Sequence, residues 1–193
     1  MGKTKYLKEI EEFFRKTPVV ATRDIKVFVK NTGYSYLLVH NLVKTGRIKR
    51  VTKGFYSIYD DPVVAVFCFK PAYIGLQDAL SFHNLWEQET ATIIVTGKRI
   101  RTGIRRIFGV NVVVRRIKPI YIFGFDTIRY GEFFIPVSDI EKTLIDFIYF
   151  NEPIREDVLR ELRRRLDQRK LAEYLKAYPD RVRRRVWRAA GRE

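Results

Sequence analysis

The stretch TRDIKVFVKNTGYSYLLVHNLVKTGRIKRVTKGFYSI, residues 22–58, decides the predicted fold of this chain. Its apolar residues recur at helical spacing from Thr22 to about residue 31 and again from Tyr34 to Thr45, where Gly46 ends the helix. Two short apolar and basic runs then predict strands over 48–51 and 55–58, joined by a tight turn at 52–54. The expected order is therefore helix, helix, hairpin.

This order is the plan of a winged helix-turn-helix. A further helix is predicted over residues 4–16, and Asp60-Asp61-Pro62 is the expected boundary because two poor strand formers precede a proline. In such a domain the last helix enters the major groove, and the hairpin follows the adjacent backbone or minor groove. We therefore expect an α+β protein, with a winged helix-turn-helix over residues 1–60 and a mixed α/β domain over 61–193 that ends in helices.

The DNA-contacting residues are expected on the second helix of this stretch and on the hairpin. Leu38 or Val39, Leu42 and Val43 are the predicted core positions of the helix. Asn41 is suited to an adenine edge, and His40 suits a base or a phosphate, although a lone histidine is also common on a solvated helix. The predicted DNA-binding set is Tyr34, Ser35, Tyr36, His40, Asn41, Lys44, Lys49, Arg50 and Lys53.

The charge of the chain points to an anionic partner. Its 193 residues include 38 Lys and Arg against 22 Asp and Glu, which gives a formal charge of +16. The excess is +8 over residues 1–60, +2 over 61–150 and +6 over 151–193. Abundant Lys, Arg and Glu with few Asn, Gln, Cys and Met is typical of thermophiles. Thermophily does not account for an excess of one sign, which favours nucleic acid.

Composition also excludes several classes of protein. An apolar fraction of 46% is ordinary for a globular chain, and one cysteine excludes a disulfide framework. No apolar run is long enough to span a bilayer, and the first residues do not resemble a secretory signal. We expect a cytoplasmic protein without a membrane partner, of undetermined oligomeric state.

The middle of the chain is expected to mix strands and helices. Strands are predicted over 63–69, 92–96, 110–114, 120–125 and 133–137, and helices over 74–85 and 139–149. Five basic residues lie in the loop predicted over 97–106, namely Lys98, Arg99, Arg101, Arg105 and Arg106. They form either a second phosphate-binding surface or an exposed hairpin edge protected by charge.

The last segment, residues 151–193, is expected to be helical and rich in arginine. The triplets 163–165 and 183–185 lie away from the predicted apolar faces. They are explained either as solvated helix surface or as a surface for RNA or an acidic partner.

The sequence offers little support for catalysis. The histidines are His40 and His83, so together with the one cysteine the chain falls short of the four ligands of a structural zinc site. Cys68 lies in an apolar run and is expected to be inert. No glycine-rich phosphate loop is present. We expect no enzymatic activity, no cofactor and no metal.

One acidic segment, residues 138–146, is read as a helix start. Ser138 and Glu141 have the spacing of a capping box, and Glu141 is a potential partner of Lys142. Asp139 and Asp146 lie seven residues apart, about 10 Å along a helix, which is too far for a shared metal.

Several segments together resemble the AbiEi-type antitoxins of type IV toxin–antitoxin (abortive infection) systems. Ala79–Gln88 is similar to an "ALS-aromatic-H-x-L-x-E-Q" helix of that family, and Glu141–Asp146 to its "EKTLxD" helix start. The hairpin from Gly46 to Tyr56 is similar to its "G-x-I-x-R…G-x-Y" pattern. The resemblance covers about residues 10–150 well and the C-terminal helices loosely; the arginine-rich stretch 181–188 has no counterpart in it.

The resemblance implies a non-enzymatic, winged-helix autorepressor that binds double-stranded operator DNA and counters a nucleotidyltransferase-like toxin. The motif residues it singles out are Ser81, His83, Glu87, Gln88, Glu141, Lys142 and Asp146, for which helix packing and capping are an equal explanation. Two alternatives stay open. One is a nucleic-acid-processing enzyme, such as a nuclease or restriction-type protein, and the other is a module that binds RNA or an acidic protein.

Overall fold

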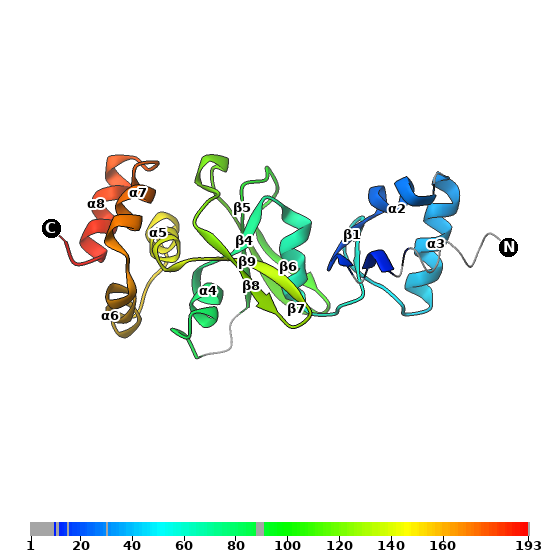
Figure 1. Cartoon of the computed structure of the whole chain (residues 1–193), viewed down its shortest axis with the longest axis horizontal. Coiled ribbons are helices and arrows are strands. Elements are labelled where there is room, and N and C mark those ends of the chain that lie inside the picture. The colour runs from blue at the N-terminus through cyan, green and yellow to red at the C-terminus, as the bar shows by residue number, and fades with distance from the viewer. Residues whose placement is uncertain (1–9, 11, 15, 30, 88–90, 193) are drawn as a thin grey trace.

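The helices and hairpin predicted over residues 22–58 are present in the computed structural model, which describes residues 10–192 except 11, 15, 30 and 88–90 (Figure 1). The predicted helix over 4–16 lies largely outside the described residues; 10, 12–14 and 16 are helical. The elements of this part are β1 (Val20–Ala21), α2 (Thr22–Val29), α3 (Thr32–Lys44), β2 (Lys49–Thr52) and β3 (Phe55–Ser57). The strands form a three-stranded antiparallel sheet in the order β1-β3-β2.

A small apolar core holds α2 and α3 against this sheet. Ile25 and Val29 of α2 meet Leu38, Val39 and Leu42 of α3 in one buried cluster. The predicted core position Val43 is wrong, since its side chain is 38% exposed. It lies one helical step beyond Leu42, which turns it toward solvent.

A six-stranded mixed sheet forms the centre of the molecule, in the order β6-β7-β5-β4-β9-β8. The pairs β4–β9 and β5–β7 are parallel, and the other neighbours are antiparallel. The strands are β4 (Ala72–Ile74), β5 (Thr92–Thr96), β6 (Gly103–Ile107), β7 (Val110–Arg116), β8 (Phe125–Tyr130) and β9 (Phe133–Ser138). The protein is thus α+β, as expected.

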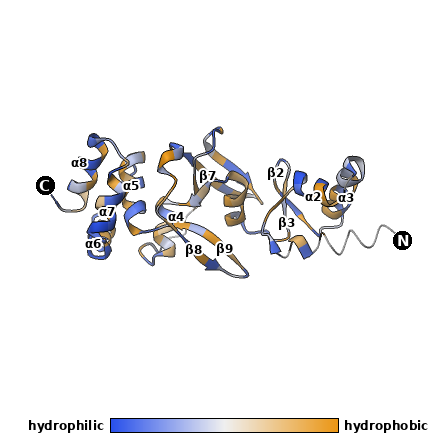
Figure 2. Cartoon of the chain, turned by 45° about the horizontal axis from the view of Figure 1, so that its top comes forward, coloured by the Kyte–Doolittle hydropathy of each residue, from blue (hydrophilic) through white to orange (hydrophobic). Residues whose placement is uncertain are grey.

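Helices cover both faces of the central sheet. Strand side chains alternate, so Ile94 joins the cluster on the face of η1, while Ile93 and Val95 join the cluster formed with α5 to α8. The helices are η1 (Pro62–Phe69), α4 (Leu76–Phe82), η2 (Pro119–Tyr121), α5 (Ile140–Phe150), α6 (Glu156–Arg165), α7 (Gln168–Leu175) and α8 (Asp180–Ala189). Hydrophilic stretches run along α6 and α8 at the C-terminal end (Figure 2).

Four expectations for the central part are wrong. Residues 63–69 form the 3-10 helix η1, because Pro62 and the cap of Asp61 on the Val63 amide, at 2.9 Å, start a helix. The helix expected from residue 74 begins at Leu76 and is preceded by the unpredicted strand β4. The loop expected over 97–106 contains most of β6. The strand expected over 120–125 instead comprises the end of η2, residues 122–124 outside any helix or strand, and the first residue of β8.

The two sheets share part of one core. Val19 and Val51 from the first sheet region are buried in the same cluster as η1 and the central strands. The hydroxyl of Tyr59 also donates to Glu132 at 3.3 Å. Among the described residues, no helix has the length and apolar character needed to cross a bilayer.

Candidate nucleic-acid interface

Helix α3 is held in place at both ends and along one face. Its N-cap Asn31 accepts a hydrogen bond from the Tyr34 amide at 2.9 Å, which satisfies one of the free donors of the first turn. At the other end, the amide of Gly46 donates to the Val43 carbonyl at 3.0 Å with φ at +71°, which suits glycine. The helix is therefore a fixed support for its exposed side chains.

The face of α3 opposite the core is open to solvent. At 100° per residue, Gly33, Leu37, His40 and Lys44 form one ridge along this face, and all four are exposed. Leu37 is 55% exposed. Together with Asn41 on one side, the ridge offers an apolar group, a histidine, an amide and a cation within two turns.

Tyr36 borders this ridge on its other side and is oriented by a residue that the sequence did not single out. The Lys26 ammonium of α2 donates to the Tyr36 hydroxyl at 2.9 Å and lies 4.5 Å from the centre of its ring. These contacts fix a 55% exposed tyrosine beside a positive charge. Lys26 and Tyr36 are ten residues apart and lie on two different helices. Helical periodicity relates residues within one helix, so it does not predict this contact.

Ser35 is excluded as a DNA contact. Its side chain is fully buried, and its hydroxyl donates to the Asn31 carbonyl at 2.6 Å. Ser35 was predicted as a DNA contact together with its sequence neighbours Tyr34 and Tyr36, but on the helix its side chain faces the core. Tyr34 itself is half-buried and packs against the same core.

The hairpin adds exposed cations next to the helix. Arg50 on β2 and Lys53 in the turn are exposed, and the turn closes at Gly54, where φ is +78°. Lys49 is also exposed, but its ammonium forms an ion pair with Asp60 at 2.6 Å. Arg50 and Lys53 are therefore better placed than Lys49 to meet phosphates.

The second basic set lies on and before the edge strand β6. Lys98, Arg99, Arg101 and Arg106 are exposed, whereas Arg105 is half-buried, donates to the Arg101 carbonyl at 2.7 Å and lies over the Phe69 ring. Ile104 on the same strand is 70% exposed. Charges along an exposed edge strand hinder pairing with other chains, so the hairpin-edge alternative fits this position, and phosphate binding stays open.

The motif residues of α5 are buried in a polar network. Lys142, fully buried, forms an ion pair with Asp146, whose other oxygen accepts from the Tyr73 hydroxyl at 2.7 Å. Burial lowers the pKa of Lys142 and raises that of Asp146, while their mutual attraction opposes both shifts. These groups therefore connect α5 to β4.

The start of α5 differs from the predicted capping box. Asp139, not Ser138, is the N-cap, and its carboxylate accepts from the Lys142 amide at 2.8 Å. Glu141 does not pair with Lys142 but accepts from the Asp167 amide at 2.8 Å and contacts the ammonium of Lys170 at 3.4 Å. The sequence motif thus fastens α5 to α7.

Two residues of α7 that the sequence did not reveal complete this attachment. Lys170 lies 3.0 Å from the Asp139 carboxylate, and the Tyr174 hydroxyl donates to the same carboxylate at 2.7 Å. Partial burial lowers the pKa of Lys170, but the carboxylates of Asp139 and Glu141 raise it by more. The nuclease alternative depended on Asp139 and Asp146, and both carboxylates are committed to these internal bonds.

The remaining motif residues lie around α4. The Nε2 atom of His83 is 2.6 Å from the Ser138 carbonyl; since a carbonyl only accepts, Nε2 carries the proton. The Ser81 hydroxyl donates within its own helix to the Gln77 carbonyl at 3.4 Å. Glu87 is exposed, and Gln88 lies outside the described residues.

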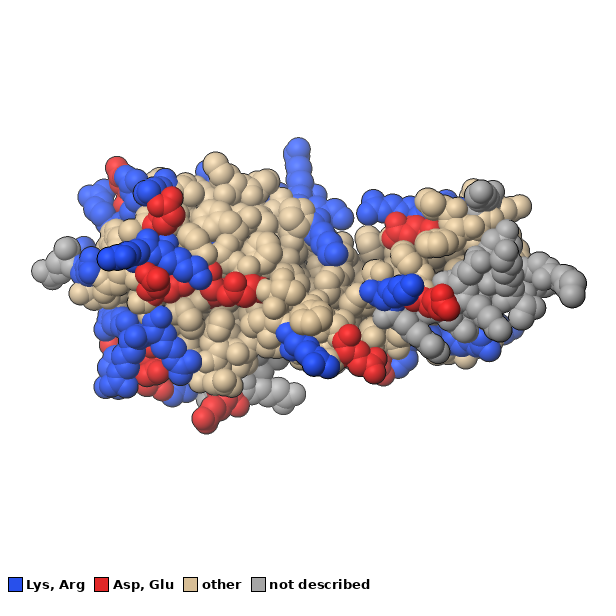
Figure 3. Space-filling view, viewed as in Figure 1, with Lys and Arg blue, Asp and Glu red and all other residues tan. Residues whose placement is uncertain are grey.

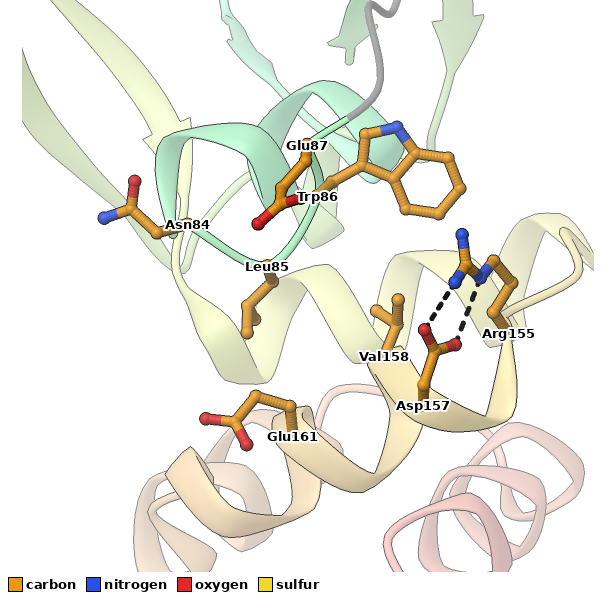
Figure 4. Close-up of a pocket in the computed structure, with 8 residues that line it drawn as sticks. All are labelled: Asn84, Leu85, Trp86, Glu87, Arg155, Asp157, Val158 and Glu161. Carbon is orange, nitrogen blue, oxygen red and sulfur yellow. Dashed lines mark hydrogen bonds and ion pairs between the residues drawn. The ribbon is translucent and has the colours of Figure 1, made fainter.

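A pocket of about 380 Å³ lies between the end of this motif and α6 (Figure 4). Arg155 binds both oxygens of Asp157, at 3.1 and 2.5 Å, and its guanidinium lies 5.8 Å from the Trp86 ring. Glu161 is bound by two arginines of its own helix. The pocket is lined by Asn84, Leu85, Trp86, Glu87, Arg155, Asp157, Val158 and Glu161. Arg155 and Asp157 thus pair with each other, and no nucleophile lies beside a base among the residues that line the pocket.

Neither a metal centre nor an activated thiol occurs in the described part of the chain. No group of three His, Cys, Asp or Glu residues there could hold a metal ion. Cys68 is buried, and burial raises its pKa to about 12, which disfavours the reactive thiolate.

Comparison with known proteins supports the fold alone. No family model matches the sequence, and no curated protein matches it. Among solved structures, the chain is similar to the RV2827C protein from Mycobacterium tuberculosis, with 11% sequence identity and a TM-score of 0.59. The likeness covers 97% of this chain and 78% of the other. The arrangement of both sheets and the helices is thus one that another solved protein shares.

Proposed function

We propose that this protein is a DNA-binding transcriptional autorepressor and the antitoxin of a type IV toxin–antitoxin system. Its first sixty residues serve as a winged helix-turn-helix that binds double-stranded operator DNA. The observation that carries the DNA-binding part is the exposed ridge of α3 beside a hairpin with the exposed cations Arg50 and Lys53. The antitoxin part is supported by the resemblance of residues 10–150 to the AbiEi-type family.

The shape of α3 suits the major groove. Its 13 residues extend over about 20 Å, and a helix with side chains fits a groove about 12 Å wide. Within the ridge, Asn41 can bond the N6 and N7 edge of adenine, and Leu37 can contact a thymine methyl. His40 and Lys44, one turn apart, can reach a base edge or the flanking phosphates.

The hairpin suits the sugar–phosphate backbone. Arg50 extends from β2 and Lys53 from the adjacent turn, and they can neutralise two phosphates, which adds affinity without sequence preference. The charge of Lys49 is partly offset by Asp60. The proposal therefore separates base-reading residues on α3 from phosphate-binding residues on the hairpin.

The first experiment measures binding to the DNA upstream of the protein's own gene by fluorescence anisotropy, against a scrambled duplex, over a salt series. A specific repressor should prefer its own DNA by about 1,000-fold or more. Replacing Arg50 and Lys53 by alanine should weaken binding to both duplexes and reduce the log–log salt slope by about 1.8. Arg160→Ala on α6 combined with Arg169→Ala on α7, an equal loss of two exposed charges, is the control and should leave the slope unchanged.

Recognition of bases by α3 is tested by a loss of affinity that is specific to the operator. Asn41→Ala should lower affinity for the operator by about 5- to 150-fold, which corresponds to 1–3 kcal/mol, with little change on scrambled DNA. Equal loss on both duplexes would remove Asn41 from base recognition. Equal affinity of the unaltered protein for both duplexes would refute the repressor assignment.

The antitoxin role implies a nucleotidyltransferase-like toxin encoded beside this protein, and it is tested in cells that express such a toxin. Co-expression should restore growth if the role is correct. The Arg50 and Lys53 double variant should still restore growth when expressed from an independent promoter, because the two roles are assigned to different parts of the chain. Failure of the unaltered protein to restore growth would refute the antitoxin assignment and leave DNA binding to be judged separately.

A further inference from the structure

The arginines of the C-terminal helices divide into two groups by their contacts. Arg163 donates to the Ala189 carbonyl at 2.8 Å, Arg165 to the His83 carbonyl at 2.8 Å, and Arg185 to the Asn151 side chain at 2.7 Å. Arg164 and Arg183 pair with Glu161 and Asp180. Five of the six arginines in the two triplets that the sequence singled out are therefore engaged in contacts within the protein.

A second group of arginines has no such bonds and converges on one place. Arg184 and Arg188 have no side-chain hydrogen bond or ion pair with any described residue, and both are exposed. With Trp187 and Arg192 they line a pocket of about 510 Å³. No acidic residue is among the four that line it. Lysine and arginine side chains are abundant over this end of the molecule (Figure 3).

The spacing of these groups is regular. Arg184, Arg188 and Arg192 follow one another at four-residue intervals, so Arg184 and Arg188 lie on one face of α8, about 6 Å apart along its axis. Trp187 is half-buried against the apolar core, which fixes its ring, and the Arg192 guanidinium lies 5.7 Å from the centre of that ring. The pocket thus combines a held aromatic plane with three cations.

We infer that this pocket is a binding site for single-stranded nucleic acid. Guanidinium groups bind phosphates, and an aromatic plane stacks with an unpaired base, which a duplex keeps inside its own stack. The volume is in the range of sites that hold one small ligand of nucleotide size. An acidic peptide would use the arginines but has no need of the tryptophan plane.

The site is separate from the proposed operator-binding surface. Helix α8 lies at one end of the elongated molecule, and α3 lies at the other, with the central sheet between them (Figure 1). The inference therefore does not rest on the proposed function. Duplex binding through α3 and single-strand binding through α8 can be lost independently.

The two tryptophans of the chain make the site directly observable. In a Trp86→Phe variant, Trp187 is the remaining fluorophore, and a single-stranded oligo(dT) or oligo(U) of about 8 nucleotides should quench it by stacking. In a Trp187→Leu variant, Trp86 remains as the control and should not be quenched. A poly-glutamate peptide should leave both signals unchanged.

Affinity measurements with a labelled oligonucleotide test the arginines. Trp187→Leu should weaken single-strand binding by about 5- to 150-fold, the range found for loss of one stacked base. Arg184→Ala with Arg188→Ala should reduce the salt slope by about 1.4, without change in duplex binding. Arg184→Ala and Arg188→Ala are also measured singly; Arg181→Ala, on the same helix but outside the pocket, is the matched control for each of them and should leave the affinity nearly unchanged.

Other outcomes overturn the inference. If Arg181→Ala weakens binding as much as the Arg184 and Arg188 substitutions, the effect is general charge and no site exists. If poly-glutamate quenches Trp187 as the oligonucleotides do, the pocket binds acidic protein. If no strand quenches Trp187, the single-strand assignment is wrong. Because Arg184 and Arg188 are exposed, their substitution is not expected to impair folding, which thermal melting verifies.

Discussion

At the scale of single residues, Asp78 is a carboxylic acid largely removed from water. Its Oδ2 atom accepts a hydrogen bond from the Ile93 amide at 3.1 Å. Burial raises its pKa from 3.8 to about 7, the hydrogen bond from Ile93 lowers it in part, and the charge of Asp61 raises it further. The folded protein therefore holds a proton at Asp78 that the unfolded chain releases near pH 4.

This shift gives the stability of the protein a defined pH dependence. Between about pH 4 and 7 the folded state binds more protons at Asp78 than the unfolded state, so its contribution to stability falls as the pH rises through this window. Asp78→Asn keeps an acceptor for Ile93 without a charge. Relative to the variant, the wild type should lose on the order of 2–4 kcal/mol between pH 4 and 8. Urea unfolding at both pH values measures this difference; parallel pH profiles would contradict it.

The residue scale also shows what a sequence can reveal about contacts. Asn41, His40 and Lys44 are exposed as helical periodicity predicts, because their own helix determines their direction. The partners of Tyr36 and Asp146 were not predictable, because Lys26 and Tyr73 come from other elements, and Tyr73 is 73 residues distant. Periodicity specifies which face a residue occupies, and only the fold specifies what lies opposite.

At the scale of elements, α5 contains a buried ion pair between Lys142 and Asp146, and Asp146 also attaches the helix to β4 by accepting from the Tyr73 hydroxyl. Lys142→Met leaves a buried carboxylate without its counter-charge and should destabilise the protein by about 3–5 kcal/mol. Adding Asp146→Asn removes the buried charge and keeps an acceptor for Tyr73, so the double variant should recover at least half of the loss. Urea unfolding measures both variants.

The control for this prediction is Lys176→Met at the C-cap of α7. Its lysine is exposed and pairs with Glu173 on the surface, so the change should cost less than about 0.5 kcal/mol. If the single and double variants at Lys142 and Asp146 are equally unstable, the loss comes from packing, and the buried charge is not its cause.

The type of an element was predictable where its hydrophobic periodicity was distinct, and the prediction was wrong where the periodicity was not. The 13 residues of α3 show an apolar stripe, and β5 and β7 show β-branched runs. The continuous apolar run of η1 suits a buried strand and a buried helix equally. Pro62 after Asp61 was the available evidence for a helix start.

At the scale of the whole molecule, the last helices are part of the main core. Leu171, Tyr178 and Val186 are buried in the same cluster as Tyr73 and Val95 of the central sheet. A chain that ends at Phe150 loses this cover from one face of the sheet. We expect such a truncated chain to lose its cooperative thermal transition and to bind the dye ANS through exposed apolar surface; a cooperative melt without ANS binding would contradict this expectation.

The overall arrangement was the least predictable level. The α+β class follows from the elements, but the order of the six central strands depends on pairings such as Ile74 with Val137. Arg165 reaches the carbonyl of His83, 82 residues away, and Val51 joins the core of the central sheet. Such contacts depend on the packed structure as a whole, and no local pattern encodes them.

The buried pair on α5 has a consequence for how this sequence can change over generations. A mutation that replaces only Lys142 or only Asp146 passes through a protein with one uncompensated interior charge. Selection removes that intermediate, so the two positions should be inherited together and exchanged together. In an alignment the two positions would then look conserved like the residues of an active site, although what conserves them is the stability of one helix.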